Sequence, residues 1–322
     1  MSRIKGEAML KLINKSRPWI YILPALICII LFRFIPIVGS FIISFFEWTI
    51  TGPGKFIGFA NYQRLLNDPE FWKSMLNTFY LVIFVVPLTI VFSLLFAVLL
   101  NNIKAFRSFF RTVYFIPFVT SLVSLSIIWK IIFNQQTGLA NSFLKILGFK
   151  PLKWLAESKG IFTLLLEPLG IDLPNWAGGP SLALFAIIIV TVWRSIGYNV
   201  VIYLAGLQGI SKSYYEAAEI DGASKTRQFF KLTLPLISPT TYYVLMMTTI
   251  TTFQVFSQVY LMTGPPIGGP DGSTKVIVYY IFEKGFELQD LSYASAIALV
   301  LFVIILSLTL LQKHFEKKHV HY

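Results

Sequence analysis

The stretch that decides the fold is residues 214–239, YYEAAEIDGASKTRQFFKLTLPLISP, a polar segment between two strongly apolar runs. Apolar residues recur at helical spacing on both sides of Gly222, which follows Asp221 and interrupts the pattern. The pattern therefore predicts a helix, a turn and a second helix. Pro235 ends the second helix, and Pro239 falls in the first turn of the next apolar run. One interpretation is an amphipathic helix pair that lies on a membrane surface.

The same segment also carries a set of residues at fixed spacing: Glu216, Ala217, Ala218, Asp221, Gly222, Ala223, Phe229, Leu234 and Pro235. This set resembles the EAA loop of ABC importer permeases. In that family the loop is cytoplasmic and forms the coupling helices that dock on the ATP-binding subunit. The resemblance implies the same role for these nine residues. The family usually has Ile two residues before the Leu-Pro pair, where this chain has Leu232.

The composition of the whole chain indicates a membrane protein. Of its 322 residues 56% are hydrophobic and 13% are charged, whereas a soluble domain carries about twice that charge. Because backbone groups in lipid must be paired within helices, and because the apolar runs are long and do not alternate, we expect an all-α integral membrane protein. The net charge of +12 does not indicate nucleic acid, since the basic residues flank apolar runs. Cys28 is the only cysteine, which excludes an intrachain disulfide.

Six apolar runs are close to the roughly 20 residues that a bilayer requires. We therefore expect an N-terminal segment over residues 1–18, a six-helix transmembrane domain over 19–311 and a basic tail over 312–322. Within the domain, residues 208–235 form the coupling loop and residues 134–180 a long outer loop. The resemblance implies the type I ABC importer permease fold. The six runs are residues 19–46, 75–100, 112–133, 181–204, 236–262 and 292–311.

The distribution of basic residues predicts the orientation of these helices. With the N-terminus inside, the inner segments hold fifteen Lys and Arg residues and the longer outer loops hold nine. Because positive charge concentrates on the cytoplasmic side, both termini are expected in the cytoplasm. The loop around Glu216 then also lies in the cytoplasm, where an ATPase partner would be.

Three further stretches indicate a particular branch of this family. They are FIGFANYQRLL before the second run, IIWKIIFNQQTGLANSFLKILG at the exit of the third, and VVIYLAGLQGISKSYYEAAEIDGAS after the fourth. They resemble the carbohydrate-uptake branch that includes the maltose and glycerol-phosphate permeases. The resemblance implies import of a sugar or oligosaccharide through the cytoplasmic (inner) membrane of a bacterium or archaeon. It also implies three kinds of partner: a second, similar permease, two ATP-binding subunits and an extracytoplasmic solute-binding protein.

The outer loop over residues 134–180 is too long to be structureless in a compact domain. We expect its later part, KGIFTLLLEPLGIDLPNW, to form a surface cap or a contact for a docking protein. The outer loop TGPPIGGPDGST has an apparent insertion at residues 265–267, because the family usually has Thr-Gly-Gly-Gly-Pro there. Before the second run, Asp68-Pro69 is expected to cap a helix that continues into that run.

Two apolar runs contain polar residues that could line a substrate pathway. In TVWRSIGYN, Arg194, Tyr198 and Asn199 form a polar patch, and a charge within a span is usually functional. In the fifth run Thr251, Gln254, Ser257 and Gln258 fall at helical spacing near aromatic residues, which suits sugar hydroxyls and C–H faces. The alternative for both sets is helix packing, since such residues also join membrane helices and Arg194 could pair with a neighbouring helix.

Several catalytic patterns are absent from the sequence. There is no Gly-x-x-x-x-Gly-Lys-Ser/Thr phosphate loop, no Gly-x-Ser-x-Gly elbow and no His-Glu-x-x-His pair. We therefore expect a non-enzymatic subunit without a cofactor or metal of its own, with ATP and Mg held by the partner ATPase subunits. His314, His319 and His321 are assigned to a solvated tail.

Two alternative functions remain open. A secondary transporter or channel that acts alone is opposed by the lack of acidic residues within the runs. An importer of another solute, such as glycerol phosphate or a peptide, would use Arg194 to neutralise an anion.

Overall fold

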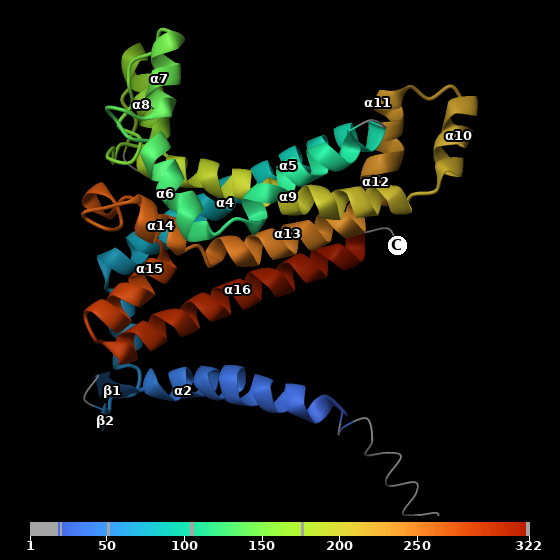
Figure 1. The fold of residues 1–322 in the computed structure, drawn as a ribbon. Helices are drawn as coiled ribbons and strands as arrows, with labels where there is room; N and C mark the ends of the chain where they lie inside the picture. Colours follow the sequence, from blue (N-terminus) through green and yellow to red (C-terminus); the bar gives the residue numbers. More distant parts are fainter. Residues whose placement is uncertain (1–18, 20, 50–51, 104–105, 175–176, 320–322) are drawn as a thin grey trace, which may run out of the picture. The chain divides into compact units, whose positions relative to one another are not determined.

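The computed structural model describes residues 19, 21–49, 52–103, 106–174 and 177–319, and it is helical over most of this length (Figure 1). The expected N-terminal segment over residues 1–18 lies outside the described residues, as does the end of the expected tail. Contacts within the chain define two compact units. One comprises the described parts of residues 1–67 together with 283–300, and the other comprises residues 68–282 and 301–322, again as far as they are described.

The first unit begins with an apolar helix over Tyr21–Ile43, long enough to span a membrane. Its middle is a π-helical turn, η1 (Ile30–Phe34), followed by α2 (Ile35–Ile43). Pro36 lies in the first turn of α2, and because proline donates no backbone hydrogen bond, the regular helical pattern changes at this point.

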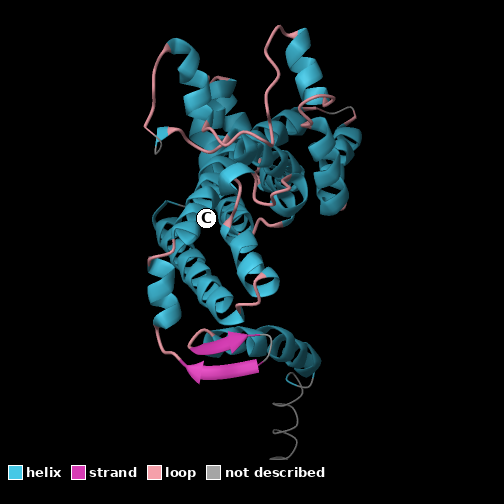
Figure 2. Cartoon of the chain, turned by 90° about the vertical axis from the view of Figure 1, so that its left-hand side faces the viewer, coloured by secondary structure: helices cyan, strands magenta, loops and turns pink. Residues whose placement is uncertain are grey.

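A short hairpin in the same unit departs from the expected all-helical fold. Strands β1 (Phe46–Thr49) and β2 (Gly52–Phe56) pair antiparallel, as Figure 2 shows. Helix α3 (Ala60–Leu66) follows, and η6 (Glu283–Glu287) precedes the start of α16 (Leu291–His319). Arg64 of α3 forms an ion pair of 2.7 Å with Asp290 at the start of α16, and its guanidinium lies 4.0 Å from the Tyr293 ring centroid.

The second unit is built around two long helices, α4 (Pro69–Asn102) and α9 (Leu182–Gly209). Leu81 and Val85 of α4 and Leu184 and Ile187 of α9 are fully buried in the core of this unit. The start of α4 confirms the predicted cap, because the Asp68 side chain accepts hydrogen bonds from two backbone N–H groups of the first turn. The cap belongs to the membrane helix itself, which is continuous over 34 residues.

The third apolar run is not one straight helix. It consists of α5 (Arg107–Val119) and α6 (Leu122–Ile132), which meet at an angle of 96°. Pro117 lies in the last turn of α5, and Thr120 and Ser121 have extended backbones, so the helical hydrogen bonds cannot continue. Gly197 of α9 lets α5 approach closely, because a Cβ atom there would lie 1.8 Å from the Tyr114 carbonyl oxygen.

The fifth run is also interrupted. It consists of α12 (Leu234–Leu236), α13 (Ser238–Phe253) and α14 (Ser257–Met262), with the break at residues 254–256. Among the described residues, four helices are long and apolar enough to span a membrane, or five if the bent α5–α6 pair is one span. The fold is thus a helical membrane protein in which two of the six apolar runs are broken.

The remaining elements form the two ends of the second unit. In Figure 1, α14 and α15 lie at one end of α9 and α13, and α10 and α11 at the other. The remaining bounds are α7 (Leu139–Ile146), α8 (Ile161–Leu166), η2 (Glu167–Leu169), α10 (Lys212–Ile220), α11 (Lys225–Gln228), η4 (Phe229–Thr233), η5 (Pro270–Gly272) and α15 (Ile277–Phe282).

Candidate functional site

A cavity of about 300 Å³ lies between α9 and the broken helix α13–α14. Along α9, its lining residues recur every three or four positions, which is one face of a helix. The same spacing holds along α13, and α5 contributes Phe118. We call this the middle cavity. Its lining residues are Phe118, Thr191, Arg194, Ser195, Tyr198, Asn199, Met247, Thr248, Thr251, Thr252, Val255 and Gln258.

The structure brings five of the seven predicted pathway residues into this lining: Arg194, Tyr198, Asn199, Thr251 and Gln258. Gln254 and Ser257 do not line it. Both lie at the break between α13 and α14, where Gln254 caps the end of α13 and its side chain is exposed. The predicted spacing assumed one continuous helix, so it does not describe the directions of the Gln254 and Ser257 side chains. Thr191 and Thr248 were missed, although each lies three residues before a predicted member, at helical spacing.

Arg194 is the charged group of the middle cavity. Its guanidinium lies 5.3 Å from the Phe118 ring centroid and donates a long hydrogen bond of 3.4 Å to the Phe118 carbonyl oxygen. Phe118 in turn stacks on Tyr198 at 4.7 Å. Among the described residues, Arg194 Nε is buried without a hydrogen-bond partner, and no acidic side chain lines the cavity. The site thus combines a cation, a stacked aromatic pair and neutral polar groups.

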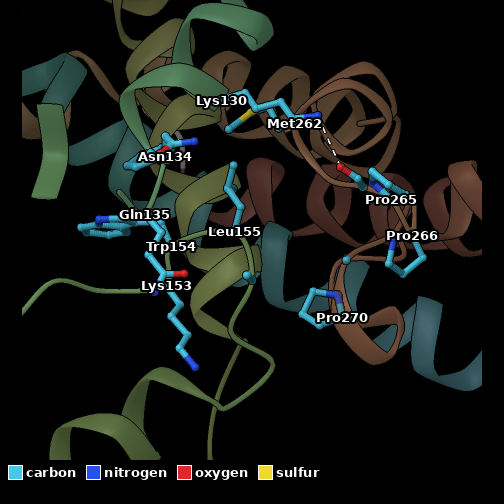
Figure 3. A pocket seen from close by; sticks show the side chains of 14 residues that line it. Lys130, Asn134, Gln135, Lys153, Trp154, Leu155, Met262, Pro265, Pro266 and Pro270 are labelled. Atoms are coloured by element: carbon cyan, nitrogen blue, oxygen red, sulfur yellow. Dashed lines mark hydrogen bonds between the residues drawn. The ribbon is translucent and has the colours of Figure 1, made fainter. Parts of the chain in front are cut away.

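A second cavity of about 280 Å³, the outer cavity, lies at the end of the unit that carries α14 (Figure 3). Lys130, Asn134, Lys153 and Trp154 line one part of it, and the prolines of the loop after α14 line another. The dashed line in Figure 3 joins Lys130 Nζ to the Gly264 carbonyl oxygen at 3.5 Å. These residues were not predicted as a site, because they come from three segments that are distant in the sequence.

The middle and outer cavities share α14 as a wall. Gln258 lines the middle cavity and Met262 lines the outer one, and the two residues are one helical turn apart. A third cavity, of about 550 Å³, follows along the same face of α9. It is lined there by Val201, Leu204, Ala205 and Gln208, and by Phe106, Ser108 and Arg111 at the start of α5. The three cavities therefore follow one another along α14 and α9 toward the end that carries α10.

The predicted coupling loop forms a helix–turn–helix elbow between α9 and α13 (Figure 1). Glu216, Ala217 and Ala218 lie on α10, and Gly222 ends it with a φ of +73°. The Ala223 N–H donates to the Ala218 carbonyl and the Gly222 N–H to the Glu219 carbonyl, which is the Schellman arrangement that requires a left-handed residue. The motif therefore has glycine at position 222 because the turn needs a residue that adopts the left-handed conformation without strain.

Side-chain contacts hold the two halves of the elbow together. The Tyr215 hydroxyl lies 3.0 Å from the Thr233 hydroxyl of η4, and Lys225 of α11 pairs with Glu219 of α10. The hydrogen bond and the charge of Lys225 lower the pKa of Glu219 below its ordinary value. The other predicted members, Asp221, Phe229, Leu234 and Pro235, lie in the turn and along η4 and α12.

The outer surface of the elbow is open. Within α10 no side chain is buried, and Ile220 is 87% exposed. Phe230 on the second half is 58% exposed. Large exposed apolar groups rimmed by polar residues are typical of a protein interface.

The family described as "Binding-protein-dependent transport system inner membrane component" matches residues 60–320. The chain belongs to this family. As a member, it is a membrane component of a binding-protein-dependent transport system, with the type I ABC importer permease fold expected from the sequence.

Relatives of this permease match nearly its whole length. It is 36% identical to the lactose transport system permease of Rhizobium radiobacter, over 91% of this chain and 92% of the relative. It is 34% identical to the trehalose/maltose transport system permease of Thermococcus litoralis, over 91% and 90%. A solved bacterial alginate ABC transporter, in complex with its periplasmic protein, contains a chain of the same fold. That chain aligns with a TM-score of 0.78 at 22% identity, with 96% of each chain covered.

The middle cavity generates a prediction with an internal control. Gln258 forms no hydrogen bond among the described residues and lines the cavity, whereas Gln254 does not line it. Gln258→Leu should therefore lower the rate of solute transport in proteoliposomes about fivefold, since one lost hydrogen bond costs about 1 kcal/mol. Gln254→Leu should transport at the wild-type rate. The reverse ranking of the two variants would show that the cavity is not on the pathway.

Proposed function

We propose that this permease moves a sugar or oligosaccharide from an extracytoplasmic binding protein into the cytoplasm, driven by ATP hydrolysis on partner subunits. The observation that carries the proposal is the row of three cavities along α14 and α9, which leads toward the exposed elbow. Relatives at 34–36% identity that transport lactose and trehalose/maltose support the solute class.

The chemistry of the middle cavity suits a saccharide. Phe118 and Tyr198 offer a stacked aromatic face for the C–H groups of a sugar ring. Gln258, Asn199 and Thr251 offer donors and acceptors for hydroxyls. We assign ATP and Mg to two partner ATP-binding subunits, as the resemblance implies.

The elbow is the proposed link to those ATPase subunits, and the chain itself is proposed to be non-catalytic. The elbow connects α9, which lines two cavities, to α13, which lines one. A movement of the elbow would thus act on both walls of the middle cavity. A second, homologous permease would complete the pathway, as the resemblance implies.

Coupling through the elbow can be tested at Gly222. Gly222→Ala places a Cβ at a φ of +73°, which costs about 1–2 kcal/mol and distorts the turn. ATP hydrolysis stimulated by the loaded binding protein should fall severalfold in the reconstituted complex. The control is Gly209→Ala at the end of α9, where a Cβ would meet nothing within 4 Å. Equal stimulation in both variants would remove the elbow from the coupling mechanism.

The proposed orientation places both termini and the elbow in the cytoplasm. In a Cys28→Ser background, Ser158→Cys in the long outer loop should react with a membrane-impermeant maleimide added to intact cells. Ser213→Cys on α10 should react only after the cells are permeabilised. Both serines are exposed, so access depends on the side of the membrane. Labelling of Ser213→Cys in intact cells would invert the topology.

A second candidate solute is a saccharide or small ester that bears an anionic group. The specific observation is that each charged residue lining the three cavities is basic: Lys130 and Lys153 in the outer cavity, Arg194 in the middle one and Arg111 in the third. A guanidinium without an acidic partner favours a carboxylate or phosphate.

This candidate is tested by charge at Arg194. Arg194→Gln should lower transport of an acidic oligosaccharide at least about tenfold, since a charged hydrogen bond contributes about 1.5–3 kcal/mol, and should spare a neutral one of equal length. Arg194→Lys should restore part of the acidic transport. Equal losses for both oligosaccharides would assign Arg194 to helix packing instead.

A further inference from the structure

The long outer loop carries an amphipathic helix whose apolar face has no partner among the residues that the structure describes. On α7 (Leu139–Ile146) and the residue after it, Leu139, Phe143, Ile146 and Leu147 are spaced as one helical stripe. Their exposed fractions are 69%, 62%, 81% and 54%. The opposite face contains Asn141, Ser142 and Lys145. We call the four apolar residues the α7 stripe.

The helix is held rigidly, so the exposure of the stripe is not a property of a loose loop. Asn141 is buried and uses its whole amide group. Its Nδ2 donates to the carbonyls of Gln135 and Leu152 at 2.9 Å each, and its Oδ1 accepts from the Leu152 N–H and from Trp154 Nε1 at 3.0 Å each. The α7 stripe is thereby fixed on the side away from Asn141.

The position of α7 places this stripe at the end of the membrane helices. The helix follows α6 after a short turn, and the remainder of the loop is tied to the first residues of α9. The Ile161 N–H donates to the Pro180 carbonyl at 2.9 Å, and the Leu182 N–H to the Lys159 carbonyl at 3.0 Å. In Figure 1, α7 and α8 run across the direction of α9 and α13. A helix across the direction of the spans, where those spans begin, lies parallel to the bilayer surface.

The charged residues near the stripe indicate what the stripe contacts. Residues 134–156 contain Lys145, Lys150 and Lys153 and no acidic residue. None of these lysines forms an ion pair among the described residues, whereas Lys159 beyond them is paired with Glu167 at 2.9 Å. An apolar stripe with one lysine on the opposite face and two more just after the helix is typical of a helix at the boundary between acyl chains and phosphate headgroups.

We infer that α7 is an interfacial anchor, whose stripe enters the outer surface of the bilayer while Lys145 and Lys150 contact phosphate groups of anionic lipid. The anchor fixes the position of the outer cavity relative to the membrane surface. Asn141 of α7 accepts a hydrogen bond from Trp154, and Trp154 lines that cavity.

The test uses the assembled transporter in nanodiscs. Cys28 is the only cysteine of this chain, so Cys28→Ser, with the cysteines of the partner subunits replaced, gives a background for single labels. A fluorophore is attached at Phe143→Cys or Ile146→Cys on the stripe, and at Ser158→Cys as the exposed control in the same loop. The lipids are phosphatidylglycerol and phosphatidylcholine with brominated acyl chains, which quench fluorescence on contact.

Labels on the stripe should be quenched at least about threefold more than the control. Quenching should be stronger with bromine near the headgroup end of the chain than near its tip, because an interfacial helix lies only about 5–10 Å deep. Labels on the stripe that are not quenched by lipid, or that respond only when the binding protein is added, would overturn the inference. Stronger quenching from the chain tip would also overturn it, because α7 would then lie inside the bilayer.

The role of the lysines is measured separately. Replacing phosphatidylglycerol by phosphatidylcholine should reduce quenching at Phe143→Cys, and in the double variant Lys145→Gln/Lys150→Gln this dependence on lipid charge should disappear. Quenching that is independent of lipid charge in the unaltered chain would contradict the phosphate contacts. Both side chains are exposed, so the double variant retains the packing of the loop.

Discussion

The constraint on which this structure depends is that lipid offers no hydrogen bonds to the backbone. Helices satisfy it, and an interruption is tolerated only where protein or a cavity surrounds it. Both interruptions in the second unit obey this rule. The break between α5 and α6 follows Phe118, and the break between α13 and α14 contains Val255, and both of these residues line the middle cavity. The broken backbone and the cavity are therefore parts of one feature.

Helix α9 connects the parts of the molecule that such a transporter requires. One face packs on α4 in the core, and Gly197 allows α5 to approach without a side chain between them. Another face lines the middle cavity and then the third cavity, and its last residues lead into the elbow. A rigid helix with these neighbours can transmit a displacement of the elbow to Arg194 and Tyr198 without any change in its own hydrogen bonds.

The two ends of the unit differ in what they expose. The elbow presents Ile220 next to Asp221 and Phe230 next to Lys231, so its exposed apolar groups lie beside charges of both signs, which suits a protein partner. The opposite end presents the α7 stripe near lysines that form no ion pair within the described part of the chain, which suits lipid. Exposed apolar area alone does not distinguish these surfaces, whereas the neighbouring charges do, because they have both signs at the elbow and are basic beside the α7 stripe.

The sequence by itself determined the helical membrane fold, the cap at Asp68, and the elbow with its glycine, because each depends on local spacing or on the conformation of a few consecutive residues. It also indicated Arg194, Tyr198, Asn199, Thr251 and Gln258, since helical periodicity holds within an unbroken helix. Only the tertiary structure decided that Gln254 and Ser257 lie outside the middle cavity, because a helix break resets the direction of every later side chain. The outer cavity also depends on the tertiary structure, since Lys130, Lys153 and Pro265 meet only when three separate segments pack together.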